Sequence, residues 1–349
     1  MGLAALFVPG PAATVDGSSV SRTALNGNLT AIRSSTDYRC YLSERESLNA
    51  GRAVSVQLQG APATAATGVY ATTFVDGWLG QMVQAQVTAN LVARDGIEVT
   101  PGDLTVGRSV LERRISAVLT TYAQDAGSTT GCGGSGTAVL ASVPASFAAE
   151  QVRAQTDQSL LDAKAAGGGL TGLAITHYFD AHRADFDKVC LSVIVVPTKK
   201  KATTLATAIE GGASFTQEAK ANSIDSTTAA NGGVAGCGVL AGTSLLEPLA
   251  DLSIGTVSAP IAYNGSYLLA EVTSRSPTSF STVQGTVMTV LLLAGQAKAD
   301  AQITAAIRRA HVGVDPRFGT LKPGTALVAP PSSPSPASLL TARANHPGA

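Results

Sequence analysis

The stretch from residue 189 to residue 275 constrains the fold more than any other part of the chain. It opens with an apolar, β-branched run that predicts a strand. After it come two helical patterns, a shorter one, and two strand patterns that are separated by Asn264-Gly265, a dipeptide typical of a tight hairpin turn. In order, these patterns lie at residues 189–196, 199–210, 214–222, near 244–252, 257–263 and 267–272. The chain is therefore organised around one unit that mixes helices with strands.

Six short motifs occur in order within this stretch. They are Leu191-Ser-Val-Ile-Val-Val196, Glu210-Gly-Gly-Ala-Ser-Phe215, Ser223-Ile-Asp225, Asn231-Gly-Gly-Val-Ala-Gly236, Gly255-Thr-Val-Ser-Ala-Pro260 and Ser266-Tyr-Leu-Leu-Ala-Glu-Val-Thr-Ser-Arg275. Each motif alone is a weak signal, but together they resemble the parvulin family of peptidyl-prolyl cis-trans isomerases (rotamases). The resemblance implies an α+β fold in which helices flank an antiparallel β-sheet.

The residues at the family's active-site positions differ from the family pattern in this chain. In the family, histidines on the first and last strands face each other beneath a Cys or Asp. The corresponding residues here are Val193, Leu268 and Asp225, so both histidines are replaced. The family's proline pocket corresponds to Ala241, Leu245 and Tyr263. The resemblance thus assigns substrate binding to Val193, Leu245, Tyr263 and Leu268, with Asp225 and Tyr263 as the catalytic candidates.

These replacements predict weak or absent isomerase activity. Isomerisation makes and breaks no covalent bond; it lowers a barrier of roughly 18–20 kcal/mol by favouring the twisted amide. An apolar groove with few polar groups could still provide some rate, so an active isomerase is the alternative. Asp225 also has a structural interpretation, because Ser-x-Asp before a glycine loop often forms a turn in which the side chain accepts backbone N–H groups.

The flanking residues resemble the helical chaperone domain of SurA-type foldases. Strand patterns on either side of Asp16-Gly17 lead to a capping serine, Ser21, and a first helix. Further helical patterns cover residues 70–92, follow Thr100-Pro101 and Pro144, and run from Thr171 to about Asp185. The glycine-rich segment 127–136 is interpreted as a loop, since it lacks the lysine of a phosphate-binding loop.

A long helix is expected from residue 279 to residue 310. Its continuous apolar run is shorter than the about twenty residues that cross a membrane, so we expect the helix to be buried. By the SurA resemblance it returns to the N-terminal helices, and residues 312–320 then supply an edge strand for residues 13–20. The resemblances divide the chain into a signal remnant or disordered tail (1–13), a SurA-like N-terminal helical chaperone domain (14–186), a parvulin-like domain (187–276), a C-terminal helix and strand returning to the chaperone domain (277–322) and a disordered Pro/Ser-rich tail (323–349).

Composition limits the partners. The chain has 24 basic and 24 acidic residues among 349, so no global field attracts nucleic acid or an anionic membrane. His177 and His182 are five residues apart, which places them off a shared helix face, and the cysteines do not form CxxC pairs. We therefore expect no metal and no cofactor.

The four cysteines form an even set. In the parvulin-like fold, Cys190 on the first strand and Cys237 after the glycine loop come close together, whereas Cys40 and Cys132 both belong to the helical domain. We predict disulfides between Cys40 and Cys132 and between Cys190 and Cys237. Persistent disulfides indicate an oxidising, extracytoplasmic location, in the cell envelope or secreted. Four reduced, buried thiols are the alternative.

Three function classes follow from these patterns. The first is an extracytoplasmic SurA/PrsA-like foldase that binds unfolded exported polypeptides and Xaa-Pro segments, with a tether through an upstream signal or lipid anchor compatible with its N-terminus. The second is an active parvulin-type isomerase. The third is a structural envelope protein with a relic module, which would neither turn over proline peptides nor suppress the aggregation of client proteins.

Overall fold

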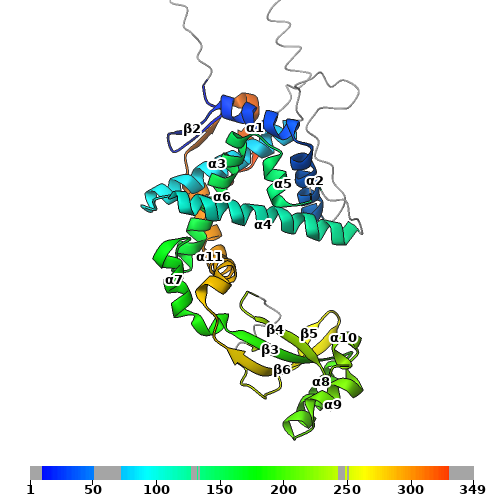
Figure 1. The fold of residues 1–349 in the computed structure, drawn as a ribbon. Helices are drawn as coiled ribbons and strands as arrows, with labels where there is room; N and C mark the ends of the chain where they lie inside the picture. Colours follow the sequence, from blue (N-terminus) through cyan, green and yellow to red (C-terminus); the bar gives the residue numbers. More distant parts are fainter. Residues whose placement is uncertain are drawn as a thin grey trace, which may run out of the picture. The chain divides into compact units, whose positions relative to one another are not determined.

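The computed structural model describes residues 10–50, 72–126, 132, 134–242, 248–249 and 251–329 (Figure 1). The chain divides into two compact units. The first contains residues 1–161 and 298–349, and the second contains residues 162–297. Helices and antiparallel sheets occur together, as the expected α+β class requires.

A small sheet opens the first unit. Strand β1 (Ala13–Val15) pairs antiparallel with β2 (Ser18–Val20) and with β7 (Val312–Val314), so the sheet order is β2-β1-β7. Asp16 and Gly17 both adopt positive φ, as a type I′ hairpin turn demands. The predicted pairing of the C-terminal strand with the N-terminal strands is confirmed.

Helices make up most of the rest of the first unit's described residues. They are α1 (Arg22–Ser34), α2 (Thr36–Ala50), α3 (Thr72–Arg94), α4 (Pro101–Ala126), α5 (Gly136–Ala141), most of α6 (Ala145–Ala165) and the end of α11 (Phe280–Arg309), followed by the 3-10 turn Pro316–Phe318 and the short strands β8 (Thr320–Leu321) and β9 (Val328–Ala329). The Ser21 hydroxyl caps α1 by accepting the Ala24 N–H at 3.0 Å. At α4, Thr100 and Asp103 accept each other's backbone N–H in a capping box.

Aromatic side chains hold the first unit together. Trp78 on α3 is 4% exposed and stacks on Phe74 and on Phe147 of α6, with ring centroids 6.3 and 5.9 Å apart. Tyr38 of α2 meets the edge of Phe147 at 5.1 Å. These contacts tie α2, α3 and α6 into one core, and such aromatic pairs add about 0.5–1.5 kcal/mol each beyond their buried area.

The second unit contains a four-stranded antiparallel sheet of order β4-β3-β6-β5. Its strands are β3 (Lys188–Val196), β4 (Val234–Val239), β5 (Ile261–Tyr263) and β6 (Ser266–Ser276). Asn264 and Gly265 have φ values of 44° and 75°, so they form the predicted hairpin turn. The central strands β3 and β6 pair along their full length, from Lys188 with Ser276 to Val196 with Tyr267.

The two faces of this sheet differ. Helices α8 (Lys199–Glu210) and α9 (Phe215–Asn222) cover one face, where Ile194, Val196 and Leu269 pack against them (Figure 1). The alternate residues of β3 and β6 form a separate apolar cluster on the other face. This second face is where the candidate site lies.

Several expectations need correction. The helix expected to reach Asp185 is α7 (Gly172–Ala181), and a 3-10 turn, Arg183–Phe186, replaces its last part. The strand expected at 257–263 starts at Ile261, because Pro260 lacks the N–H that a ladder needs. Helix α5 and strand β4 were not predicted, because α5 starts at the end of the segment interpreted as a glycine-rich loop and β4 itself contains two glycines. The helix expected near 244–252 lies largely outside the described residues.

Helix α11 is only partly buried, contrary to expectation. Apart from Met288, its buried residues form one stripe at a spacing of about four, which comprises Val283, Val287, Leu291, Gly295, Ala299 and Ile303. By length and composition, α11 is long and apolar enough to cross a membrane, with a window of mean hydropathy 1.2. The core helix of a soluble protein passes the same test, so this is weak evidence for a membrane span. No other helix in the described ranges meets these criteria.

Candidate peptide-binding sites

The two residues that replace the family histidines lie on the open face of the β3–β6 pair. Val193 is paired with Ala270, and Leu268 is paired with Val195. Val193 and Leu268 are therefore diagonal neighbours on adjacent strands, and both side chains point away from α8 and α9. Each is less than 9% exposed. No proton can be exchanged by either side chain, so the pair contributes apolar surface only.

These side chains line a groove of about 700 Å³. The groove also brings together Asp225, Tyr263, Leu191, Val195 and Leu240. Apart from the disulfide-bonded Cys237, the titratable side chains among its described lining residues are those of Asp225 and Tyr263. Four of the five predicted site residues, Val193, Asp225, Tyr263 and Leu268, thus share one groove. The fifth, Leu245, lies outside the described residues, and the roles of all five stay predictions.

Asp225 has a structural task in this groove. It is the N-cap of the short helix α10 (Ser226–Ala229). Its Oδ1 accepts the Thr227 N–H at 3.1 Å, and its Oδ2 accepts the Thr228 hydroxyl at 2.7 Å. The Thr228 hydroxyl and the Thr227 and Thr228 N–H groups lower the pKa of the Asp225 carboxyl. Both oxygens are engaged locally, which agrees with the turn interpretation of Asp225.

A glycine brings the chain close to the groove wall. Gly233 has a φ of 90°, and its carbonyl accepts the Val193 N–H at 2.7 Å. A Cβ at this position would lie 2.7 Å from the Val193 carbonyl oxygen and 3.2 Å from the Phe215 ring. Glycine is therefore required here both for its backbone conformation and for space.

The structure joins the cysteines in the two predicted pairs. Cys40 is bonded to Cys132 in the first unit, with 5.4 Å between their Cα atoms. Cys190 on β3 is bonded to Cys237, its direct cross-strand partner on β4, with 3.9 Å between their Cα atoms. The second disulfide also borders the groove, because Cys237 is one of its lining residues.

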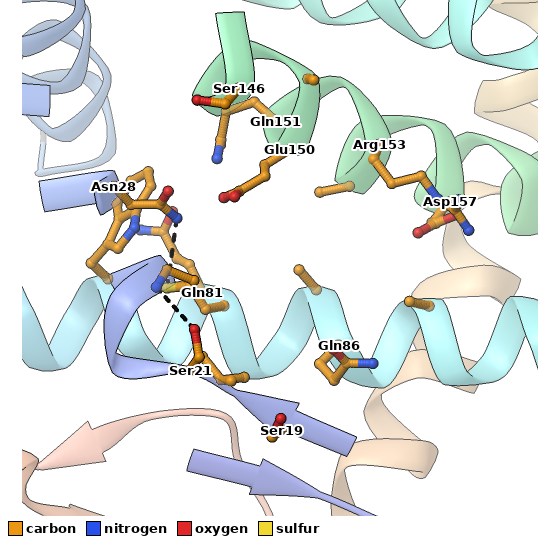
Figure 2. Close-up of a pocket in the computed structure, with 18 residues that line it drawn as sticks. Ser19, Ser21, Asn28, Gln81, Gln86, Ser146, Glu150, Gln151, Arg153 and Asp157 are labelled. Carbon is orange, nitrogen blue, oxygen red and sulfur yellow. Dashed lines mark hydrogen bonds and ion pairs between the residues drawn. The ribbon is translucent and has the colours of Figure 1, made fainter. Parts of the chain in front are cut away.

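The first unit contains a second hollow that sequence reasoning missed. It has a volume of about 590 Å³ and lies between α3 and α6 (Figure 2). The α3 residues that line it are 78, 81, 82, 85, 86 and 89, and the α6 residues are 146, 149, 150, 151, 153, 154 and 157. Apart from residue 151, each set has the spacing of one helix face. Four alanines, Ala85, Ala89, Ala149 and Ala154, leave the gap open where larger side chains would have packed.

Polar groups border this hollow. Figure 2 shows Gln81 and Gln86 on α3, with Glu150 and Arg153 on α6 across from them. Arg153 forms an ion pair with Asp157 at 2.9 Å. Burial raises the pKa of Asp157, and the Arg153 guanidinium opposes that shift. Amides can donate to and accept from a peptide backbone whatever its sequence. An alanine floor with amide edges therefore suits broad binding of polypeptide.

An antiparallel sheet with two helices on one face and an apolar groove on the other has the architecture expected of a parvulin-type domain. Residues 174–284 match the family model described as the PPIC-type PPIASE domain. The chain therefore carries a parvulin-type peptidyl-prolyl isomerase domain, as the six motifs predicted. No curated protein matches the chain.

Solved structures show a likeness over more of the chain. PrsA from Bacillus anthracis is 16% identical with a TM-score of 0.35, and the match covers 66% of this chain and 96% of PrsA. PrsA from Bacillus cereus is also 16% identical, with coverages of 70% and 86% and a TM-score of 0.39. A chain from the study of the SurA-like chaperones PEB4 and Cj1289 of Campylobacter jejuni is 17% identical, with coverages of 69% and 94% and a TM-score of 0.23. At these identities and scores, the likenesses do not indicate what this chain binds.

Proposed function

We propose that this protein is an extracytoplasmic foldase that binds unfolded, exported polypeptides. The hollow between α3 and α6 holds client segments, and the groove of the parvulin-type domain holds Xaa-Pro segments with weak or no isomerase activity. The observation that carries the proposal is the apolar pair of Val193 and Leu268 at the centre of the groove. This surface binds apolar segments but has no imidazole with which to polarise the amide.

Groove chemistry supports binding more than turnover. A rate enhancement requires interactions that are stronger with the twisted amide than with the planar one. Asp225 already accepts hydrogen bonds from Thr227 and Thr228 through both oxygens. The apolar contacts of Val193 and Leu268 stabilise the planar and twisted forms about equally, so they favour affinity over rate.

An active isomerase is the second candidate, and Tyr263 favours it. Its side chain lines the groove and packs against the apolar cluster of the open face. A phenol can donate a hydrogen bond to an amide whose carbonyl has lost conjugation. If the enzyme is active, replacement of Tyr263 with Phe removes most of the rate and leaves peptide binding intact.

The location and the domain boundaries are part of the proposal. Two disulfides suit an oxidising compartment outside the cytoplasm. The functional division places the chaperone domain at 14–186 and 277–322 and the isomerase-like domain at 187–276. A membrane tether through an upstream signal or a lipid is compatible with this arrangement.

Aggregation of an unfolded client tests the foldase proposal. Replacing Ala85 with Trp fills the hollow between α3 and α6, and Ala85→Ser serves as the size-matched control. We expect the wild type and Ala85→Ser to suppress light scattering by a chemically unfolded, proline-free client at equimolar ratio. Ala85→Trp should lose most of this suppression with unchanged far-UV circular dichroism. Equal suppression by all three proteins would exclude the hollow as the client site.

A further inference from the structure

A carboxyl group lies beside one of the two disulfides. Cys40 and Glu44 are four residues apart on α2, so they share one face of the helix. The Cys40 Sγ is 3.9 Å from the Glu44 Oε1. The sulfurs of Cys40 and Cys132 and a carboxylate oxygen of Glu44 all lie within 4.8 Å of one another. The sulfurs are bonded to each other, so in this state the cluster is a disulfide with a neighbouring acid, not a metal site.

Glu44 is buried, and part of its hydrogen-bonding capacity is unused. The residue is 6% exposed, and its Oε2 has no hydrogen-bond partner among the described residues. The backbone N–H of Cys132 donates to the carboxylate, which lowers its pKa, but burial raises the pKa by more. A buried, partly unsatisfied carboxyl costs stability, so its presence calls for an explanation.

Among the described residues, no cationic side chain is paired with this carboxyl. On its own helix, the Arg45 guanidinium is bonded to Glu46 and lies over the Tyr41 ring. In the part of the chain that the structure describes, no charged side chain of α1, α4 or α5 shifts the pKa of Glu44. In the described ranges, the groups next to this carboxylate are therefore the Cys132 N–H and the two sulfurs.

The redox state of Cys40 decides whether its sulfur can donate a hydrogen bond to Glu44. In the disulfide neither sulfur bears a proton, so the 3.9 Å contact between Sγ and Oε1 is not a hydrogen bond. In the dithiol the Cys40 thiol can donate to the carboxylate. We propose that Cys40 and Cys132 form a thiol–disulfide exchange site for external dithiols, in which Glu44 gives a proton to the leaving sulfur and takes it back when the bond re-forms.

The exchange balances in protons and electrons. A thiolate of the external dithiol bonds to the Sγ of Cys40, the less buried of the two cysteines, and the Cys40–Cys132 bond breaks. Its electron pair stays on the Sγ of Cys132, which takes the Glu44 proton. The second thiolate of the reagent then attacks its own mixed-disulfide sulfur and releases Cys40, which takes a proton from water, and Glu44 is reprotonated from water. Overall, the dithiol is oxidised to a disulfide, and two electrons and two protons pass to the cysteines.

The other disulfide provides an internal reference. Cys190 and Cys237 bridge β3 and β4, and neither sulfur has a hydrogen bond to a carboxylate within the described ranges. Both disulfides meet the same reductant in one reaction. The fraction of reagent present as thiolate changes with pH, but it affects both reduction rates equally. It therefore drops out of the ratio of the two rates.

The test follows the reduction of both disulfides in the oxidised full chain by dithiothreitol between pH 4 and pH 8. Samples are quenched by acid and alkylated, and peptide mass spectrometry separates the Cys40/Cys132 pair from the Cys190/Cys237 pair. We expect the ratio of the first rate to the second to fall as pH rises, because Glu44 loses its proton. In Glu44→Gln the ratio should be flat with pH and about tenfold lower at the acidic end.

Two controls keep the outcome decisive. Glu46→Gln alters a more exposed carboxyl on the same helix and should reproduce the wild-type profile. If Glu44→Gln fails to fold, the wild-type profile and its solvent deuterium isotope effect test the same step. A wild-type ratio that does not vary with pH, or a Glu44→Gln profile equal to that of the wild type, would overturn the proposal.

Discussion

The groove of the parvulin-type sheet and the hollow between α3 and α6 are built in opposite ways. The groove comes from one continuous stretch of chain, and its floor is made of large apolar side chains on paired strands. The hollow combines segments from β2, α1, α3 and α6, and alanines and amides are prominent in its lining. The first surface offers apolar contact at one place, whereas the second offers hydrogen bonding along two helix faces. If both surfaces bind polypeptide, as we propose, the groove selects apolar side chains and the hollow accepts peptide backbone of any sequence.

Removal of one disulfide or the other should give the largest difference in stability between the two units. Replacing Cys40 and Cys132 with serine opens a loop of 92 residues, for which chain entropy gives an upper limit of about 4–5 kcal/mol. Replacing Cys190 and Cys237 opens a loop of 47 residues, with a limit of about 4 kcal/mol. Trp78, the one tryptophan of the chain, lies in the first unit and reports its denaturant unfolding by fluorescence. We expect the first pair of replacements, and not the second, to lower the Trp78 midpoint.

A glycine beside the groove gives the next largest effect. Gly233→Ala should destabilise the second unit by about 2–3 kcal/mol, because the new Cβ strains a positive φ and meets the Val193 carbonyl. Gly236→Ala is the matched control: φ is 106° there, but nothing lies within 4 Å of a Cβ. The control should lose about 1–2 kcal/mol from the strain alone. Equal losses in denaturant titrations followed by circular dichroism would show that the close approach has no cost.

A buried acid makes the first unit sensitive to pH. Asp76 is 1% exposed, and neither carboxylate oxygen has a partner among the described residues. Burial raises the pKa of Asp76 to about 6. The folded state therefore holds this proton more tightly than the unfolded state, whose carboxyl titrates near pH 4. Stability contributed by the protonated form is present below pH 4 and is lost as pH rises through about 6, by about 3 kcal/mol.

Asp76→Asn should remove this dependence. We expect the Trp78 unfolding free energy of the variant to be nearly constant between pH 4 and pH 7, apart from the other titrating groups. Asp300→Asn, an exposed carboxyl of the same unit, should keep the wild-type slope. If the unfolding free energy of Asp76→Asn varied with pH as in the wild type, the Asp76 carboxyl of the wild type would have to be hydrated in solution.

The smallest effect separates the two roles of Asp225. Asp225→Ala removes the cap of α10 and should cost the second unit about 1 kcal/mol. Because the folded pKa of Asp225 is lowered, its stabilisation is present above the unfolded pKa near 4 and is lost as pH falls through the folded value. Asp225→Asn keeps the acceptor for Thr227 and should keep most of the stability. If peptide titrations monitored by NMR show a large loss of affinity in Asp225→Asn, the carboxylate contacts the substrate directly.

The groove could be predicted from the sequence and the hollow could not, for a physical reason. Val193, Asp225, Tyr263 and Leu268 could be located because ordered motifs place them on known elements of a recognisable fold. Ala85 and Ala149 carry no such signal, since alanine suits a core, a surface or a gap equally well. Strand β4 escaped prediction because its glycines lack β propensity and only the pairing with β3 makes it a strand.

The proposal that the groove binds Xaa-Pro segments with weak or no isomerase activity is tested by the cis/trans exchange of short Xaa-Pro peptides. NMR exchange spectroscopy is applied with the oxidised protein at catalytic and then at stoichiometric concentration, with Tyr263→Phe as the control variant. We expect bound-state shifts at stoichiometric protein and, at catalytic concentration, exchange close to the uncatalysed time of tens to hundreds of seconds. Strong acceleration at catalytic concentration that Tyr263→Phe abolishes would contradict the proposal and make this protein an isomerase that works without the histidines of its family.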